Sequence, residues 1–278
     1  MILRYLDAHC HVQFGAFDAD REELIERMKK RGVAGVVVGC DLESSRQAVA
    51  LAEAHEHLFA SVGLHPNHEC DEWYDISYYR SLAASPKVVA IGECGLDYFR
   101  LPAVALAKEG PEYTHEELKE RQKVLLKEQI TLAAELDKPL IIHSRPTKGT
   151  QDAYRDLIQI LKEAKASYPS LRGDIHFFVG GVEEMQELVS LGFTVSFTAV
   201  ITFARDYDEV IRAVPLASLL AETDAPYVPP TNRSRGSRND PLAVEDVVAK
   251  LAEIRGEDVE TLRNTIVANS HRLFSLPS

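Results

Sequence analysis

The chain alternates short apolar runs rich in β-branched residues with longer segments whose apolar positions recur at helical spacing. The short runs predict eight β-strands, at residues 3–8, 32–39, 58–63, 88–92, 139–142, 173–178, 193–197 and 216–221. The clearest amphipathic segments predict helices at residues 19–31, 43–56, 74–84, 242–254 and 257–272. Strands that alternate with helices are typical of a parallel sheet. Eight such units, joined by right-handed crossovers, predict an α/β fold, a (β/α)8 TIM barrel with all βα loops at one end.

Length and composition agree with this fold. The chain has 278 residues, which suits one barrel better than two domains, so residues 1–278 are predicted to form a single domain. The net charge of −12 argues against non-specific binding of nucleic acid over the whole surface, although bound cations can reverse the field locally. The N-terminal apolar run is too short for a signal peptide, and no stretch approaches the roughly 20 apolar residues of a membrane span. We therefore expect a cytoplasmic protein, with no membrane association and no obligate protein partner implied.

Six residues of metal-ligand type end or follow the predicted strands. They are His9, His11, Glu93, His143, His176 and Asp224. His9 and His11 are two residues apart at a strand end, so both side chains should project to one side and could hold a single cation. Each of the others, alone, could be a core histidine, an ion-paired carboxylate or a turn residue. Their recurrence at strand ends favours a metal centre, because these ends meet at the barrel mouth and burying such a ring without a cation would carry a heavy desolvation cost.

Six ligands are too many for one open tetrahedral zinc ion but suit two cations that share a carboxylate. Such a pair is typical of hydrolysis, in which it activates water and clamps the attacking and leaving oxygens. Asp224 is predicted to accept the proton of the attacking water. Four imidazoles favour zinc, manganese, iron or nickel over a pure magnesium site.

Further residues near the strand ends are candidates for supporting roles. His65 is predicted to contact substrate or to support a ligand, and Arg145 to bind an anion, with a rim salt bridge as its alternative. Asp7, two residues before His9, is a candidate to support that ligand. Cys10 and Cys94 adjoin proposed ligands, and strand alternation should turn them into the barrel wall. All four cysteines (Cys10, Cys40, Cys70, Cys94) are read as reduced thiols.

Two long loops stand out. Residues 99–115 contain prolines and a Gly-Pro pair without a strand pattern, and are expected to extend over the barrel mouth. Residues 227–240 contain three arginines and no acidic residue before Asp240. This second segment is either a solvated loop or a phosphate-binding loop, since the planar guanidinium suits phosphate oxygens.

The motifs together resemble the TatD family of metal-dependent hydrolases, within the amidohydrolase superfamily. The resemblance runs in order from residue 7 to Asn269 and covers nearly the whole chain. Its motifs are Asp7–His11, Gly63–Pro66, Ile91–Tyr98, Lys138–Arg145 and Glu222–Pro226. The chain departs from the usual pattern at bulky Phe177 after His176, in a longer loop after Tyr98, and in extra residues at 232–239.

The resemblance implies a (β/α)8 barrel with two divalent ions, Mg²⁺, Mn²⁺ or Zn²⁺. It implies that His9, His11, Glu93 and Asp224 hold one ion, and that Glu93, His143 and His176 hold the other. Glu93 would then bridge the two ions, and Glu93 and Asp224 would be the catalytic residues. The implied activity is that of a deoxyribonuclease, a 3′-5′ exonuclease acting on single-stranded DNA ends.

Two alternatives remain open from the sequence. The same pair of ions can polarise a carbonyl, so the chain could hydrolyse small esters, amides or aminoacyl groups, a reading that the acidic composition and the altered rim favour. A scaffold without activity is the other alternative, and the intact set of ligands argues against it.

Overall fold

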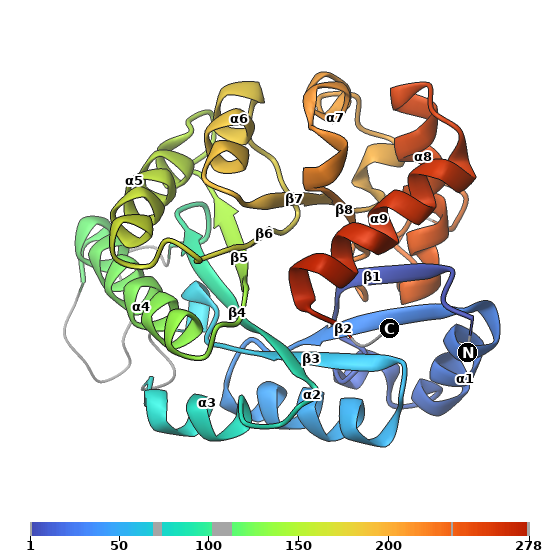
Figure 1. Cartoon of the computed structure of the whole chain (residues 1–278), viewed down its shortest axis with the longest axis horizontal. Coiled ribbons are helices and arrows are strands. Elements are labelled where there is room, and N and C mark those ends of the chain that lie inside the picture. Colours follow the sequence, from blue (N-terminus) through green and yellow to red (C-terminus); the bar gives the residue numbers. More distant parts are fainter. Residues whose placement is uncertain (1, 69–73, 102–112, 235, 277–278) are drawn as a thin grey trace.

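The structure is a computed structural model that describes residues 2–68, 74–101, 113–234 and 236–276. Eight parallel strands form one sheet, in which the spatial order follows the sequence, and the helices surround it (Figure 1). The strands are β1 (Tyr5–Cys10), β2 (Val33–Val38), β3 (Leu58–Val62), β4 (Val88–Asp97), β5 (Leu140–Arg145), β6 (Gly173–Ile175), β7 (Thr194–Phe197) and β8 (Leu219–Ala221). The predicted TIM barrel is confirmed.

The α-helices of the described chain fill the connections between strands and follow the last one. They are α1 (Arg21–Arg31), α2 (Leu42–Ala54), α3 (Ile76–Leu82), α4 (His115–Glu135), α5 (Asp152–Ser167), α6 (Val182–Ser190), α7 (Asp208–Ala213), α8 (Val244–Arg255) and α9 (Val259–Phe274). Local signals explain their ends: Asp41 and Ser44 form a capping box at the start of α2, and left-handed Gly32 ends α1. A large buried cluster joins residues of the strands to apolar faces of the helices.

The barrel closes between β1 and β8 through a few backbone hydrogen bonds at its mouth. Asp224 N donates to His9 O over 2.9 Å, and His11 N donates to Ala225 O over 2.8 Å. The seam between these strands therefore runs through three of the predicted ligands. The hydrogen bonds that close the barrel therefore also bring these three side chains together.

A buried carboxylate reinforces this seam. The Asp7 side chain accepts hydrogen bonds from the backbone N and Oγ1 of Thr223, at 2.9 and 2.5 Å, and from the backbone N of His9 at 3.2 Å. Asp7 was predicted to support the His9 ligand. The structure places its carboxylate against backbone groups beside His9 and Asp224, not against the imidazole of His9.

The boundaries of several strands differ from prediction, among them those of β4 and β8. The fourth strand was expected to end at residue 92, but β4 continues to Asp97, so Glu93 lies inside the strand. Gly92 and Gly95 interrupt the apolar run, yet their φ angles of +144° and +142° allow the backbone to stay paired with β5. The eighth strand was expected at 216–221, but residues 216–218 form a 3-10 turn and only Leu219–Ala221 are extended.

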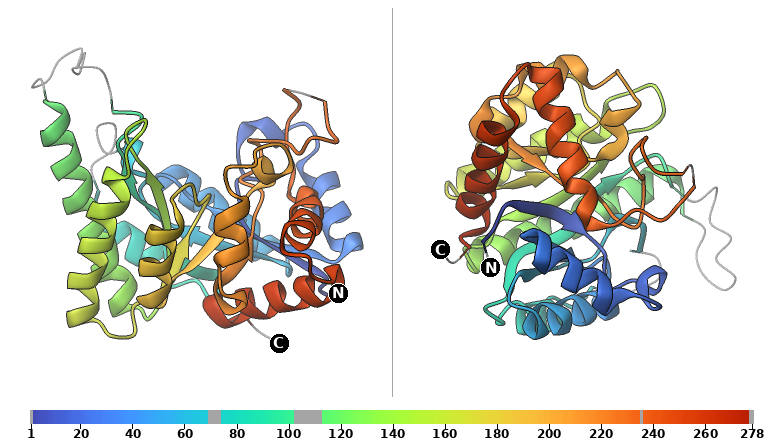
Figure 2. Two further views of the ribbon diagram at one scale, coloured as in Figure 1. Left: turned by 90° about the horizontal axis from the view of Figure 1, so that it is seen from above. Right: turned by 90° about the vertical axis from the view of Figure 1, so that its right-hand side faces the viewer.

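Different segments of the chain lie at the two ends of the barrel. Both termini of the drawn chain lie at one end, and the loop that carries residues 227–240 lies at the other (Figure 2). The mouth therefore lies where the carboxyl ends of the strands meet, as in other barrels of this type. No helix in the described part of the chain is long and apolar enough to cross a membrane.

Candidate metal centre

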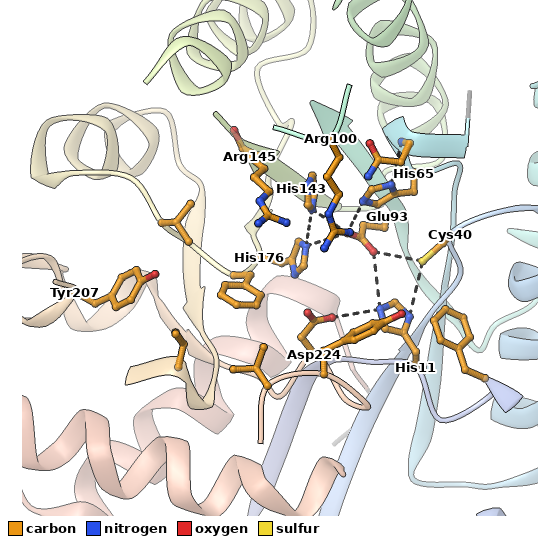
Figure 3. A pocket seen from close by; sticks show the side chains of 18 residues that line it. His11, Cys40, His65, Glu93, Arg100, His143, Arg145, His176, Tyr207 and Asp224 are labelled. Atoms are coloured by element: carbon orange, nitrogen blue, oxygen red, sulfur yellow. Dashed lines mark hydrogen bonds and ion pairs between the residues drawn. The ribbon is translucent and has the colours of Figure 1, made fainter. Parts of the chain in front are cut away.

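A cavity of about 690 Å³ opens at the mouth of the barrel (Figure 3). Its lining includes five of the six predicted ligands, together with the two predicted substrate contacts. These seven residues are His11, His65, Glu93, His143, Arg145, His176 and Asp224. The sixth predicted ligand, His9, lies fully buried beneath them. The structure thus brings together side chains that are as much as 215 residues apart in the sequence, from His9 to Asp224.

One oxygen of Glu93 faces a first group of side chains, contributed by the barrel seam. Glu93 Oε2 lies 3.5 Å from His9 Nε2 and 3.9 Å from His11 Nε2. Asp224 Oδ1 lies 3.8 and 3.4 Å from the same two nitrogens, which are 3.1 Å apart. Four atoms from β1, β4 and the segment after β8 therefore converge on one point.

The other oxygen of Glu93 faces a second group. Glu93 Oε1 lies 3.2 Å from His143 Nδ1 and 2.9 Å from His176 Nε2, and these two nitrogens are 3.3 Å apart. His143 belongs to β5 and His176 follows β6. Glu93 therefore lies between two separate sets of imidazoles, with one oxygen turned to each.

In His11 and His143, one ring nitrogen donates a hydrogen bond. That bond shows which nitrogen of each ring is free to bind a cation. His11 Nδ1 donates to Val38 O over 2.8 Å, which leaves the lone pair of its neutral ring on Nε2. His143 Nε2 donates to Asp97 Oδ2 over 3.1 Å, which leaves the lone pair on Nδ1. Burial raises the pKa of Asp97, but the hydrogen bond and charge of His143, together with hydrogen bonds from Arg100 N and Asn67, lower it to about 2, so this acceptor is ionised. Both lone pairs face carboxylate oxygens, and a cation between them would stabilise this arrangement.

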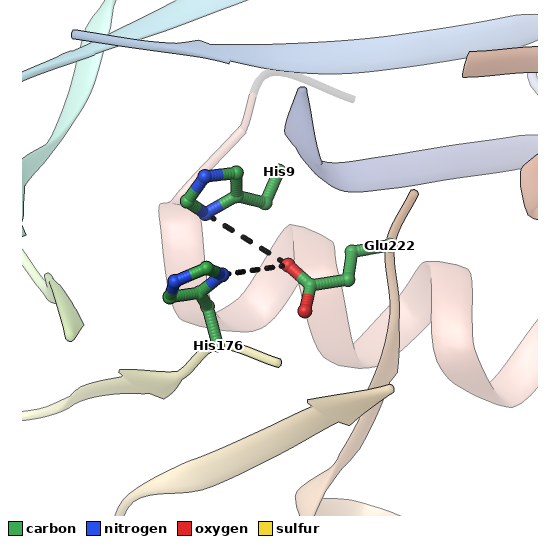
Figure 4. A group of neighbouring side chains, drawn as sticks. All are labelled: His9, His176 and Glu222. Carbon is green, nitrogen blue, oxygen red and sulfur yellow. Dashed lines mark ion pairs between the residues drawn. The ribbon is translucent and has the colours of Figure 1, made fainter. Parts of the chain in front are cut away.

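Glu222 lies behind both groups (Figure 4). Its Oε2 is 3.8 Å from His9 Nδ1 and 3.5 Å from His176 Nδ1, and the two rings stack with centroids 3.9 Å apart. All three atoms are buried, and none has a hydrogen-bond partner in the described structure. A neutral imidazole has one lone pair, so rings that bind through Nε2 carry a proton on Nδ1. Glu222 therefore faces the Nδ1–H group of one ring of each group as a hydrogen-bond acceptor, rather than as a ligand that holds an ion with them.

His65 differs from the four predicted histidine ligands. Its Nδ1 accepts a hydrogen bond of 3.1 Å from the backbone N of Asn67, so the neutral ring carries its proton on Nε2. Nε2 lies 3.3 Å from Glu93 Oε1 and is a donor to it. Burial lowers the pKa of His65 to about 4, which keeps the ring neutral. His65 thus supports Glu93 by a hydrogen bond.

The backbone around the site is tightly constrained. A Cβ atom at Gly95 would lie 1.9 Å from His143 O, so only glycine lets β4 approach β5 here. Asp224 and Phe177, which follows His176, have φ angles of +50° and +46°. Left-handed conformations are uncommon for such residues and concentrate at functional sites. They turn the chain sharply at two of the converging side chains.

The arginines of the loop at 227–240 and Arg145 of β5 differ in whether they have a carboxylate partner. In the loop at 227–240, Arg233 pairs with Asp240 at 3.0 Å and Arg238 with Asp20 at 2.6 Å. Neither lines the cavity, so for these two arginines the reading of a phosphate-binding loop is wrong, because nearby carboxylates already hold them. The third arginine of the loop, at 235, lies outside the described residues. Arg145 does line the cavity, and among the described residues it has no salt bridge.

Several residues in or around the site were given no role from the sequence. Asp97 and Glu222 stand within the motifs quoted above but had no role assigned, and an acidic residue near a strand end was the available signal. Cys40 Sγ lies 3.4 Å from Glu93 Oε2, although no motif marked it. Cys10 and Cys94 are buried in the wall, as expected, with Sγ near the carbonyls of Val36 and Ile141. Of the loop expected at 99–115, residues 102–112 lie outside the described structure.

Comparison with known proteins places these features in a family. A family model for TatD related DNases matches residues 6–275. The chain is 35% identical to the uncharacterized metal-dependent hydrolase YabD of Bacillus subtilis over 274 residues, which cover 97% of this chain and 98% of the relative. It is 33% identical to the 3′-5′ ssDNA/RNA exonuclease TatD of Escherichia fergusonii over 269 residues, with 94% and 95% covered. The crystal structure of the TatD homologue YjjV from Escherichia coli matches over 100% of both chains, with 32% identity and a TM-score of 0.84.

Proposed function

This chain belongs to the family of TatD related DNases, and from that premise we propose that it is a metal-dependent deoxyribonuclease that removes nucleotides from the 3′ ends of single strands. The observation that carries the proposal is the position of Glu93, whose two oxygens face two separate groups of imidazoles. The relative from Escherichia fergusonii, named as a 3′-5′ ssDNA/RNA exonuclease, supports the choice of substrate.

The residues present fit two divalent ions. In this proposal His9, His11, Asp224 and Glu93 Oε2 hold one ion, and His143, His176 and Glu93 Oε1 hold the other. When bound, two such ions lower the pKa of water and neutralise charge on a phosphate. Four imidazoles favour Zn²⁺ or Mn²⁺, and Mg²⁺ remains a candidate because phosphate oxygens complete its usual ligand set.

The side chains of the cavity then have distinct tasks. Burial raises the pKa of Asp224, but the neighbouring imidazoles, His11 first, lower it more, so the pKa lies below its ordinary value and the carboxylate is ionised. Asp224 can therefore accept the proton of the attacking water. His65 holds Glu93 in place through its Nε2–H, and Arg145 contributes positive charge toward a phosphate oxygen.

A direct test combines metal analysis with end-specific degradation. The purified protein is loaded separately with Mg²⁺, Mn²⁺ and Zn²⁺, and elemental analysis should find two ions per chain. Single-stranded DNA labelled at its 5′ end should shorten stepwise from the 3′ end, and a blocked 3′ end should stop this. Asp224→Asn is the inactive control, and exposed Glu183→Gln is the matched one. Metal-loaded protein that shortens no strand would refute the proposal.

One alternative is favoured by a specific observation. The net charge of −12 disfavours long polyanions, so a hydrolase of small esters, amides or aminoacyl groups would suit the surface better than a nuclease. The same preparations should therefore be assayed with neutral acyl esters. Faster turnover of those esters than of DNA would favour this second function.

A further inference from the structure

Arg145 occupies a defined place relative to the candidate metal centre. It lies two residues beyond His143 on β5, and the two residues pair with Asp97 and Gly95 of β4. Residues two apart on a strand project to the same side, and each residue adds about 3.3 Å, so Arg145 begins about 6.6 Å nearer the mouth than His143. An anion held by Arg145 would therefore lie outward of one held at Glu93.

A second guanidinium shares this position. Arg100, which follows β4, lines the same cavity as Arg145. Figure 3 shows both side chains reaching into the cavity beside His143. Phe99 packs on Arg145 with the guanidinium carbon 4.1 Å from the ring centroid, which orients the planar group.

Within the described part of the chain, neither arginine of this pair forms a salt bridge with a carboxylate. Asp97 is the acidic residue nearest in sequence, but its oxygens accept from His143, from Asn67 Nδ2 and from the backbone N of Arg100. Most other arginines of the described chain have a carboxylate within 4 Å, as Arg233 and Arg238 do. Two adjacent guanidinium groups without a counter-charge repel each other, and an anion between them would remove that repulsion.

We infer that Arg100 and Arg145 form a second phosphate subsite, which takes the phosphate next to the one being cleaved. This inference rests on the proposed function, which places the scissile phosphate at Glu93. It specifies the substrate class further: the site takes a chain with at least two successive phosphates, such as an oligonucleotide end, in preference to an ester with a single phosphate.

A neutral linkage placed at one position of the substrate tests this inference. A 5′-labelled single-stranded oligonucleotide is compared with versions in which one internucleotide linkage near the 3′ end is an uncharged methylphosphonate. With the natural protein, neutralising the linkage adjacent to the scissile one should lower kcat/KM about tenfold or more, the range for a hydrogen bond to a charged group.

The variants Arg100→Gln and Arg145→Gln should lose a similar factor on the fully charged oligonucleotide. They should show little further loss on the methylphosphonate version, because the two changes remove the same contact and cannot add. Arg145→Lys keeps the charge without the planar fork and should fall between the two. Arg233→Gln, whose guanidinium is already held by Asp240, is the matched control and should keep the full sensitivity to the neutral linkage.

Binding supplies a readout that does not depend on turnover. Fluorescence anisotropy with an oligonucleotide whose 3′ linkages are phosphorothioates should show that each glutamine variant lowers the slope of log K against log salt by about 1. Glutamine variants with unchanged salt slope and unchanged sensitivity to the neutral linkage would overturn the subsite while leaving the nuclease standing. A natural protein that cleaves no oligonucleotide would overturn the proposed function itself.

Discussion

The two groups of side chains that meet at Glu93 are built in different ways. The first, His9, His11 and Asp224, spans the seam between β1 and β8 and contains a carboxylate of its own. The second, His143 and His176, comes from β5 and from the segment after β6 and supplies imidazoles alone, so Glu93 is the carboxylate that faces its inner nitrogens. Since a carboxylate attracts a divalent cation more strongly than a neutral ring does, we expect the first position to bind its ion more tightly. We therefore expect the ion at the first position to be held firmly and the ion at the second to exchange more readily.

The largest expected effect comes from removing what both groups share. Glu93→Gln should reduce both ions to trace levels and lower activity by more than about a hundredfold, the upper end for substitutions that merely support a ligand. Elemental analysis after dialysis and the 3′-end assay measure this, with Glu183→Gln as the control. Two ions retained by Glu93→Gln would break the idea that Glu93 joins the groups.

The next prediction separates the groups. His143→Ala should leave about one ion per chain, because the seam group keeps its ligands, whereas Asp224→Asn should weaken the tighter position first. Calorimetric titration of each metal-free variant resolves the two affinities. If His143→Ala and Asp224→Asn lose the same ion, or both ions together, the asymmetry drawn above is wrong.

Smaller effects are expected behind the ligands. Glu222 faces one ring of each group, so Glu222→Gln should weaken both positions about 10- to 100-fold, as outer carboxylates commonly do. Asp97 faces His143 alone, so Asp97→Asn should weaken the second position and spare the first. Titration of the two variants side by side sharpens the comparison. An equal loss in both positions for Asp97→Asn would contradict it.

The smallest effect concerns stability. Chelation should lower the free energy of unfolding by about 2.7 kcal/mol for each ion previously present at 100 times its dissociation constant, and the melting temperature should fall as well. Differential scanning calorimetry with and without a chelator measures the shift, and Asp224→Asn should show a reduced shift because the seam position is already weakened. If the chelator left the melting temperature unchanged, the prediction that bound ions stabilise the fold would be wrong.

The barrel and the convergence of the six candidate side chains could be predicted because both depend on local pattern. Apolar runs mark strands, and parallel strands bring their ends together, so His143 and His176 could be placed near each other without knowing any contact. Boundaries were less predictable where glycine broke the pattern: Gly92 and Gly95 read as a strand end, yet close packing against β5 continues the strand past Glu93.

The remaining features depend on contacts between distant residues. In the sequence, Arg233 and Arg238 lie in a segment without acidic residues before Asp240. In the structure, Asp240 and Asp20 form salt bridges with them. The local signal at Glu222, an acidic residue near a strand end, could not assign its role, because that role comes from two imidazoles that approach it from β1 and from the segment after β6. Contacts of this kind between distant residues depend on the fold and cannot be predicted from the spacing of neighbouring residues.

The seam between β1 and β8 has a consequence for the life of the protein in a cell. The strands on either side carry the ligands of one ion and share few backbone hydrogen bonds, so a shortage of that metal would loosen the first and last parts of the chain from each other. Loosened ends are where proteases begin. We expect the abundance of the protein to follow the supply of this metal, because protein that lacks the ion would be degraded by proteases.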